Sequence, residues 1–247
     1  MKPVIIVMAR IGSSRLPGKV LLPLGGAPIL AHLLTRLRSV NSADAVVVAT
    51  SDMARDEQIV EVCQRLGVPV FRGSEIDTMD RFYRTAEAFN ADIAVRVTAD
   101  CPLIDPATVD LVIHTIENTG ADYVSTDIVP MYPNGMGCDG FSRSALRRLY
   151  EVSRNVDPDE SWMLTRDDSL GLVRTQVPAA ALGNLSDYRV TVDTPEDYAL
   201  VSKIFSVLPD IVNYTLDDII CVLRQHPEWR DINAAVKQKT GPHRQLA

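Results

Sequence analysis

The chain of 247 residues carries a net charge of −7, and 46% of its residues are hydrophobic. This length allows a large core in one or two domains, and the acidic balance argues against broad nucleic-acid binding. The four cysteines include no Cys-x-x-Cys pair and no histidine at ligand spacing, so we expect reduced thiols and no zinc site. The apolar run before Arg10 is too short for a signal peptide or a membrane span, so we expect a cytoplasmic protein without a membrane partner.

The first expected element is a buried strand at residues 4–7, a short apolar run whose β-branched residues are typical of a parallel sheet. The loop at residues 8–19 follows it, at the strand end where open α/β sheets bind ligands. Within this loop, Gly12 and Gly18 allow the backbone to turn or to approach a ligand closely. The loop's charged residues are all cationic and precede the first acid of the chain: Arg10, Arg15 and Lys19. This pattern predicts a polyanion site, and a solvated surface loop is the alternative interpretation.

Helices and strands are expected to alternate along the next hundred residues. The apolar periodicities predict, in order, helix 29–37, strand 45–50, helix 59–66, strand 68–71, helix 80–89, strand 93–98 and helix 106–116. Gly67 is a helix stop, Pro69 favours an edge strand, and Asp105 is an N-cap ahead of a proline. The alternation predicts an α/β fold with a Rossmann-like, mostly parallel twisted sheet flanked by helices.

The second half of the chain is more irregular. We expect strands at 123–125, 172–177 and 188–192, a loop or hairpin at 130–140, a short helix started by Asp157 and Pro158, and helices capped by Thr194 and Thr215. The expected organisation is a single domain over residues 1–236 with a small hairpin and helix excursion at 127–180. Residues 237–247 are expected to form a flexible tail.

Two aspartates each follow an expected strand and therefore share an edge of the sheet with the cationic loop. Asp100 has no evident local partner, and the cap position after Asp193 belongs more plausibly to Thr194. Two carboxylates beside bound phosphates could hold Mg²⁺. A turn or cap role is the alternative for each.

Three segments carry a resemblance to a known family. Residues 9–19 read Ala-Arg-x-x-Ser-x-Arg-Leu-Pro-Gly-Lys, and residues 25–30 provide a second glycine-bearing turn. Residues 97–105 are similar to a Thr-Gly-Asp-x-Pro-Leu-Ile-Asp segment, with Ala99 in place of glycine, and residues 192–197 read Val-Asp-Thr-Pro-Glu-Asp. Together they resemble the cytidylyltransferases that activate acidic sugars, such as CMP-Kdo and CMP-neuraminate synthetases. The resemblance is strongest to the branch called spore coat polysaccharide biosynthesis protein F.

The resemblance implies a fold of the nucleotide-diphospho-sugar transferase type and a Mg²⁺-dependent reaction between CTP and a small acidic sugar, with release of pyrophosphate. Cytosine as the base rests on the resemblance alone, and a homodimer is implied in the same way. Asp100 and Asp193 would hold the metal, and Arg15, Lys19 and Asp100 would act in catalysis. The nucleotide-binding residues would be Ala9, Arg10, Gly12, Ser13, Ser14, Arg15, Lys19 and Asp100.

The sugar side departs from the family pattern. Residues 132–139 resemble a Tyr-Pro-Asp-Gly-Leu-Asp-Val-Glu segment with substitutions, and residues 159–166 replace a stretch that usually contains a histidine. Asp139 and Arg166 are the candidate substrate contacts there.

Two other functions stay open at this point. A glycosyltransferase that uses a nucleotide sugar would normally show an Asp-x-Asp pair, and Asp100 is followed by Cys101 and a proline instead. A non-catalytic sugar- or nucleotide-binding relative is the other alternative. Cys101 is interpreted as a buried thiol, because no base stands at a recognisable spacing to activate it.

Overall fold

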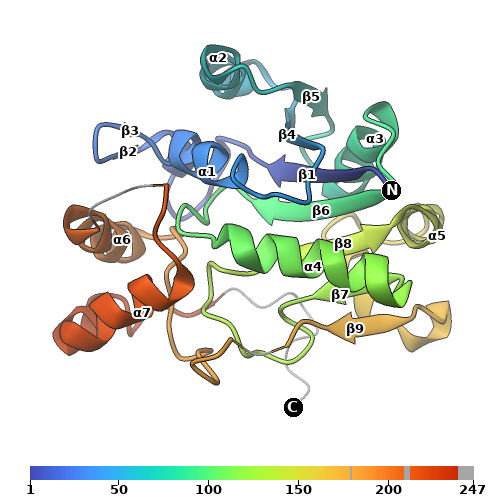
Figure 1. Ribbon diagram of the computed structural model, residues 1–247. Helices are drawn as coiled ribbons and strands as arrows, with labels where there is room; N and C mark the ends of the chain where they lie inside the picture. The colour runs from blue at the N-terminus through green and yellow to red at the C-terminus, as the bar shows by residue number, and fades with distance from the viewer. Residues whose placement is uncertain (179, 209–211, 239–247) are drawn as a thin grey trace.

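The computed structural model describes residues 1–178, 180–208 and 212–238. A seven-stranded sheet forms its centre, in the order β5-β4-β1-β6-β8-β7-β9 (Figure 1). Every strand of this sheet except β8 runs in the same direction, since β8 is antiparallel to both of its neighbours, and a separate antiparallel hairpin is formed by β2 (Pro23–Leu24) and β3 (Ala27–Pro28). The strands are β1 (Pro3–Met8), β4 (Ala45–Ser51), β5 (Val70–Gly73), β6 (Ile93–Thr98), β7 (Tyr123–Ser125), β8 (Asp139–Ser142) and β9 (Arg174–Gln176). The expected mostly parallel α/β sheet is therefore confirmed, with Pro69 directly ahead of an edge strand.

Seven α-helices flank the sheet in the described part of the chain. They are α1 (Ile29–Leu37), α2 (Glu57–Leu66), α3 (Thr78–Ala88), α4 (Pro106–Thr119), α5 (Arg143–Ser153), α6 (Pro195–Val207) and α7 (Leu216–Gln225). The expected caps are present: Gly67 ends α2 in the left-handed conformation, and Asp105 accepts the Ala107 N–H at the start of α4. Thr194 and Thr215 each start a helix with a complete capping box.

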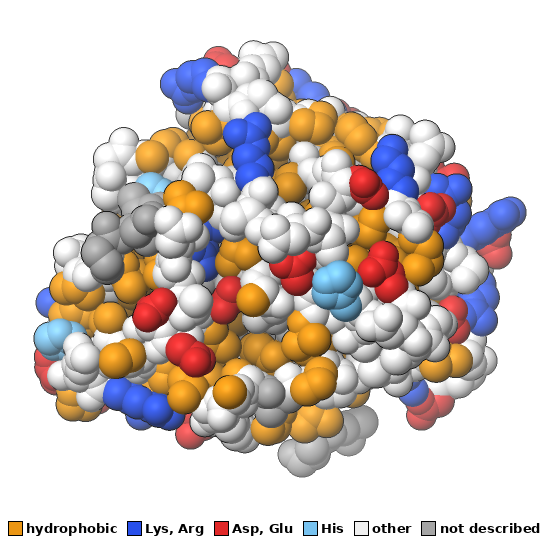
Figure 2. Space-filling view, viewed as in Figure 1, with side chains coloured by type: hydrophobic (Ala, Val, Ile, Leu, Met, Phe, Trp, Pro, Cys, Tyr) orange, Lys and Arg blue, Asp and Glu red, His pale blue; other side chains and the backbone are white. Residues whose placement is uncertain are grey.

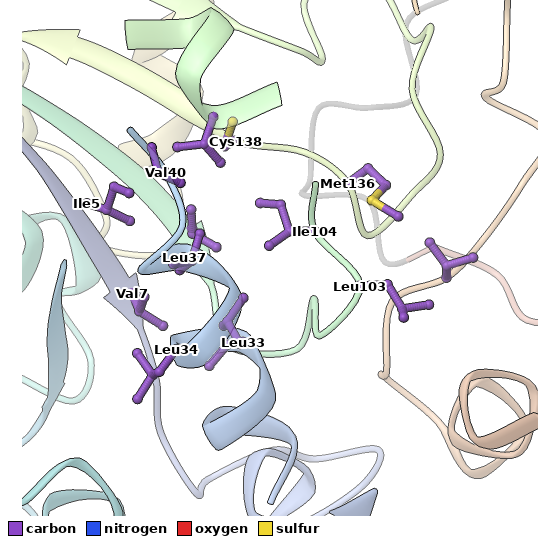
Figure 3. Packing of buried hydrophobic residues seen from close by; sticks show 14 of the residues in the cluster. Ile5, Val7, Leu33, Leu34, Leu37, Val40, Leu103, Ile104, Met136 and Cys138 are labelled. Carbon is purple, nitrogen blue, oxygen red and sulfur yellow. The ribbon is translucent and has the colours of Figure 1, made fainter. Parts of the chain in front are cut away.

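Two apolar cores lie on the two faces of the sheet. Val4 and Ile6 of β1 pack with α3 and α5, while Ile5 and Val7 point to the opposite face and pack with α1, α2 and α4. Figure 3 shows the second packing, in which leucines of α1 lie against Ile5 and Val7. Because both faces are covered, the open positions for polar ligands are at the strand ends.

The view in Figure 1 shows α1 and α4 in front of the sheet. From the same side, Figure 2 shows acidic and basic side chains interspersed with hydrophobic ones and no single basic patch on this face. Within the described ranges, no helix combines the length and apolar character needed to span a bilayer.

Several predictions of secondary structure are wrong, and two elements of the structure were not predicted. Residues 188–192 form no strand and make only an isolated bridge between Asn134 and Arg189. Asp157 and Pro158 start a turn, and the short helix is a 3₁₀-helix that begins at Ser161. The strand expected at 172–177 shortens to β9, and the strand β8 and the helix α5 were not anticipated. The expected flexible tail lies, from residue 239 onward, outside the described residues.

A glycine explains how residues 188–192 are held without a sheet. Val190 and Thr191 both donate backbone N–H groups to the Asn134 carbonyl, at 2.7 and 3.1 Å. Gly135 follows with φ of +107°, and a Cβ placed there would lie 2.4 Å from the Thr191 nitrogen. The excursion therefore packs backbone against backbone at this position, which only glycine permits.

The Gly135→Ala variant is expected to lose on the order of 3 kcal/mol in free energy of unfolding, because both the backbone angle and the space exclude a side chain. Urea denaturation measures this loss. Gly183→Ala is the matched control, since Gly183 also has a positive φ of +85° but meets nothing within 4 Å. Equal losses in the two variants would contradict the argument from backbone contact.

Candidate active site

The candidate site lies at the carboxyl ends of β1 and β6, the two central strands. Ala9 continues from β1 and hydrogen-bonds to the Ala49 carbonyl, while Ala99 continues from β6 and hydrogen-bonds to the Met8 carbonyl. The cationic loop and the Asp100 segment therefore leave the sheet side by side. This agrees with the prediction that both follow the carboxyl ends of strands in one parallel sheet.

The cationic loop folds back on itself and is hydrogen-bonded to the segment that follows β4. The Gly18 and Ser13 N–H groups both donate to the Ile11 carbonyl, and Gly18 has φ of +70° directly before the 3₁₀-helix Lys19–Leu21. Asp56, which is fully buried, accepts the Ile11 N–H at 2.8 Å. These contacts fix the direction in which Lys19 leaves the backbone.

Lys19 joins the two predicted aspartates. Its Nζ lies 2.5 Å from Asp100 Oδ2 and 2.7 Å from Asp193 Oδ1. Arg15 Nη2 adds a third contact, 2.9 Å from Asp193 Oδ2. Asp193 lies in a loop and not at the end of a strand. This loop is held beside Asp100 because the Val192 N–H donates to the Asp100 carbonyl at 2.8 Å. The two aspartates thus meet as predicted, although the strand expected before Asp193 is absent.

The charges of this cluster stabilise one another. Burial alone lowers the pKa of Lys19, but the Asp100 and Asp193 carboxylates outweigh it and raise that pKa above its ordinary value. Burial alone raises the pKa of Asp193, but Lys19, Arg15 and Arg189 outweigh it and hold that pKa below its ordinary value. Lys19 is therefore protonated and Asp193 ionised at neutral pH.

These shifts predict a pH dependence of stability. Asp193 has a folded pKa below its unfolded value, so its contribution is present above pH 3.8 and is lost as the pH falls through the folded pKa. The free energy of unfolding of the wild type is therefore expected to fall more steeply on acidification below pH 3.8 than that of Asp193→Asn. Denaturant titrations across this range measure the difference, with the exposed substitution Asp44→Asn as control. Parallel curves for wild type and Asp193→Asn would contradict the expectation.

The donor set suits Mg²⁺ in the presence of phosphates. Asp100 and Asp193 present carboxylate oxygens to one common cation, and Mg²⁺ prefers such hard oxygen ligands together with substrate phosphates. The described residues contain no cluster of three or more His, Cys, Asp or Glu side chains that could hold a metal without such additional ligands. The two aspartates therefore fit a metal that is completed by the substrate.

A buried network behind Asp193 fixes its position, and sequence analysis did not identify it. Arg189 Nη2 lies 3.0 Å from Asp193 Oδ2, and Arg189 also donates to both oxygens of Asp197 at 2.8 Å. Asp197 is fully buried and further accepts the Asn233 side-chain amide and the Asp193 and Thr194 backbone N–H groups. Arg189 therefore holds the loop that carries Asp193 and the start of α6 together.

A cavity of about 450 Å³ opens above Lys19. Its described lining brings together all the residues predicted to bind nucleotide: Ala9, Arg10, Gly12, Ser13, Ser14, Arg15, Lys19 and Asp100. Cationic side chains outnumber the two carboxylates in this lining, since Arg81 and Arg96 join the three cations of the loop. The excess of positive charge suits a polyphosphate.

Arg81 is a further residue that the sequence analysis missed. It comes from α3, is almost fully buried and lines the cavity; its Nη1 donates to the Ser74 carbonyl at 2.6 Å, and its buried Nε has no hydrogen-bond partner among the described residues. Burial, helped by the nearby Arg10, lowers the pKa of Arg81 to about 10, so it stays charged at neutral pH. Because this Nε is buried, it is an unsatisfied donor within the protein, while the charge of the guanidinium adds to the positive potential of the cavity.

A second cavity of about 650 Å³ adjoins the first and contains the predicted sugar-side residues. Asp139 lies in it but is nearly buried: Arg96 donates to one carboxylate oxygen, and Tyr123 and Ser125 donate to the other. Arg166 lines the same cavity and is paired with Asp127 at 3.6 Å. The structure brings both candidates to this cavity, but the hydrogen bonds of Asp139 point to a role in holding Arg96.

Comparisons with known proteins show which family and fold the chain is similar to. A protein-family model described as "Cytidylyltransferase" matches residues 4–134. The chain is 30% identical over 227 residues to the spore coat polysaccharide biosynthesis protein SpsF of Bacillus subtilis, covering 90% of this chain and 94% of that one. A solved cytidylyltransferase from Leptospira borgpetersenii superposes with a TM-score of 0.87 and 30% identity, covering 97% and 99% of the two chains. A CMP-2-keto-3-deoxy-manno-octonic acid synthetase solved with CTP shares the fold, with a TM-score of 0.65 at 22% identity over 83% of this chain and 99% of that one.

Proposed function

The chain belongs to the cytidylyltransferase family, and we propose that it transfers a cytidylyl group from CTP to a hydroxyl of a small acidic sugar, releasing pyrophosphate. The product would be a CMP-activated sugar for the biosynthesis of a surface polysaccharide or glycoconjugate, in keeping with the name of the Bacillus subtilis relative. The observation that carries the proposal is the sharing of Lys19 between Asp100 and Asp193 beneath a cavity rich in cations.

The loop residues would bind the triphosphate of CTP. Arg10, Arg15 and Lys19 supply charge, and Ser13 and Ser14 supply hydroxyl groups at the cavity wall. Ala9 and Gly12 border the same space; because the Ala9 N–H is donated to the Ala49 carbonyl, the Gly12 N–H is the one that would approach phosphate oxygens. Arg81 adds a further positive charge at the wall of this cavity.

Asp100 and Asp193 would hold Mg²⁺, which when bound neutralises phosphate charge and makes the α-phosphorus a better electrophile. Lys19 would turn from the carboxylates to the phosphates as the nucleotide enters, because its ammonium group suits either anion. Arg15 and Lys19 then stabilise the charge that develops on pyrophosphate as it leaves.

No protein nucleophile is required for this transfer. Phosphoryl-type transfer depends mainly on positioning and charge stabilisation, with the acceptor hydroxyl attacking in line. Cys101 is nearest to the carboxylates, but burial and the neighbouring Asp100 raise the pKa of its thiol far above neutrality. The thiol is thus unreactive at neutral pH, in agreement with the sequence interpretation.

The experiment that tests the proposal incubates the protein with each of the four NTPs, Mg²⁺ and a panel of acidic sugars, and measures pyrophosphate. Release with CTP and an acidic sugar is the expected result. No release with any NTP would contradict the proposal and favour a non-catalytic relative or a glycosyltransferase. Preference for UTP or ATP would overturn the assignment of cytosine.

We also propose a homodimer formed through the excursion at residues 127–180. Ile128, Val129 and Val173 are large apolar side chains of this region that remain exposed in the single chain. A dimeric mass in light scattering is expected, and a monomeric mass at micromolar concentration would contradict this part of the proposal.

A further inference from the structure

Two consecutive residues, Lys237 and Gln238, contact the two arginines that pair with Asp193. Arg15 Nη1 donates to the Lys237 carbonyl at 3.4 Å, and Arg189 Nη1 donates to the side-chain oxygen Oε1 of Gln238. The other terminal nitrogen of each arginine, Nη2, lies against Asp193 Oδ2, at 2.9 and 3.0 Å. Each arginine therefore connects this short segment to the same carboxylate oxygen.

The segment that carries Gln238 is fixed at its start by Asn233. The Asn233 side-chain amide donates to the Arg189 carbonyl at 3.2 Å and to Asp197 Oδ1 at 2.8 Å. Asn233 is almost fully buried, and its own carbonyl accepts the Val236 N–H at 3.0 Å, which turns the chain. Gln238 is thus returned to the arginine from which the segment starts.

The side chain of Gln238 acts as an acceptor at this place. Arg189 Nη1 and Asn134 Nδ2 both donate to its Oε1, the second at 2.8 Å. Because an arginine nitrogen can only donate, the amide oxygen must face it. Asp197 already accepts from Nε and Nη2 of Arg189, at 2.8 Å each. Gln238 therefore takes the remaining nitrogen without adding a third carboxylate, and the charge of Arg189 is shared only between Asp197 and Asp193.

We propose that Gln238 is a positioning residue for Asp193. By holding Arg189 Nη1, Gln238 keeps the guanidinium on Asp193 Oδ2 and leaves Oδ1, which lies 2.7 Å from Lys19 Nζ, to a divalent cation. Without Gln238, Nη1 would be free beside Asp193 and would compete with the cation for its oxygens. This inference rests on the proposed function, since that function places the cation at Asp193.

The same contact connects the two cavities. Gln238 and Asn134 both line the second cavity, and Asp193 lines the first. Hydrogen bonds therefore run from the wall of the second cavity through Gln238 and Arg189 to the carboxylate in the first. Outer partners of this kind orient the groups that hold a metal ion.

Binding of Mn²⁺ in the presence of CTP, without an acceptor, tests the inference without turnover. Water proton relaxation measures the affinity, because Mn²⁺ on the slowly tumbling protein relaxes water faster than Mn²⁺ on free CTP. The Gln238→Leu variant should bind Mn²⁺ about 10-fold more weakly than the wild type, as is typical when an outer partner of a metal site is removed. Gln238→Glu keeps an oxygen toward Arg189 and adds negative charge, so it should bind Mn²⁺ at least as tightly as the wild type.

Two controls separate positioning from folding. Gln64→Leu changes an exposed glutamine of α2 and should leave Mn²⁺ affinity unchanged. Calorimetric binding of CTP in EDTA should be the same for Gln238→Leu and the wild type, because Arg189 is not among the described residues that line the first cavity. A merely structural role for Gln238 would weaken CTP and Mn²⁺ binding together, and Gln238→Glu would restore neither.

Unchanged Mn²⁺ affinity in Gln238→Leu, an equal loss in Gln238→Glu, or no binding of Mn²⁺ by the wild type with CTP would overturn the inference. Pyrophosphate release tests the proposed function separately. Transfer by the wild type together with unchanged Mn²⁺ affinity in Gln238→Leu would refute the role of Gln238 and leave cytidylyl transfer standing. Weaker Mn²⁺ binding in Gln238→Leu, restored in Gln238→Glu, without any transfer by the wild type would refute the transfer and leave the positioning role standing.

Discussion

The Asp100→Asn variant is expected to lose at least about 100-fold in kcat, while the protein stays folded. Removing one preorganised electrostatic group from an active site costs on the order of 3 kcal/mol of transition-state stabilisation. The substitution keeps the size of the side chain but removes the charge that faces Lys19 at 2.5 Å and that would hold Mg²⁺. Pyrophosphate release at saturating CTP measures the loss, and circular dichroism checks the fold.

Metal dependence gives this prediction a second readout. If Asp100 is a metal ligand, the Mg²⁺ concentration for half-maximal activity should rise in Asp100→Asn, and the same should occur in Asp193→Asn. The double variant should lose less than the product of the two single effects, because the carboxylates act on one cation. Wild-type turnover in Asp100→Asn would refute its assignment as a catalytic residue.

The Asp197→Ala variant is expected to lose about 3–5 kcal/mol in free energy of unfolding. It removes a fully buried carboxylate that accepts two hydrogen bonds from Arg189 and one from Asn233, and leaves the Arg189 charge without its buried partner. Urea denaturation measures the loss. We also expect lower kcat, since Arg189 would no longer be held against Asp193.

Asp218→Ala is the matched control for this second prediction. Asp218 completes the capping box at Thr215 as Asp197 does at Thr194, but it is exposed and has no arginine partner among the described contacts. Its loss should cost only about 1 kcal/mol. Equal losses in the two variants would show that the Arg189 network adds nothing beyond helix capping.

The local signals of the sequence predicted where the candidate site lies, at the ends of β1 and β6. An apolar β-branched run followed by a glycine-bearing cationic loop predicted that Lys19 lies at the carboxyl end of β1. A similar apolar run predicted that Asp100 lies at the carboxyl end of β6. Both predictions depend only on residues nearby in the sequence. In a parallel sheet the loop after each strand begins at the same edge, independently of the rest of the chain. Asp193 reached the predicted place for a different reason, since a loop held by Asn134 and Asp100 carries it there.

The arginines at the centre of the site could not be predicted in this way. Arg189, Arg81 and Arg96 lie within a loop, a helix and a strand, where an isolated arginine usually indicates a solvated face. Their roles depend on partners 8, 7 and 43 positions away in sequence, namely Asp197, Ser74 and Asp139. The strand β8 was missed because Gly140 lowers its strand propensity. Antiparallel pairing with β6 and β7 overrides that preference.

The reversed direction of β8 has an evolutionary consequence. Because β7 runs toward the ligand edge and β8 runs away from it, the chain between them, residues 126–138, leaves and re-enters the sheet at the same edge. This segment borders the second cavity, but its Tyr132, Met136 and Cys138 are buried in the core, and its Asn134 carbonyl accepts the Val190 and Thr191 N–H groups ahead of Asp193. Evolution can therefore vary exposed positions of this segment, such as Ile128 and Val129, whereas a change in its length would disturb the core and the loop that carries Asp193.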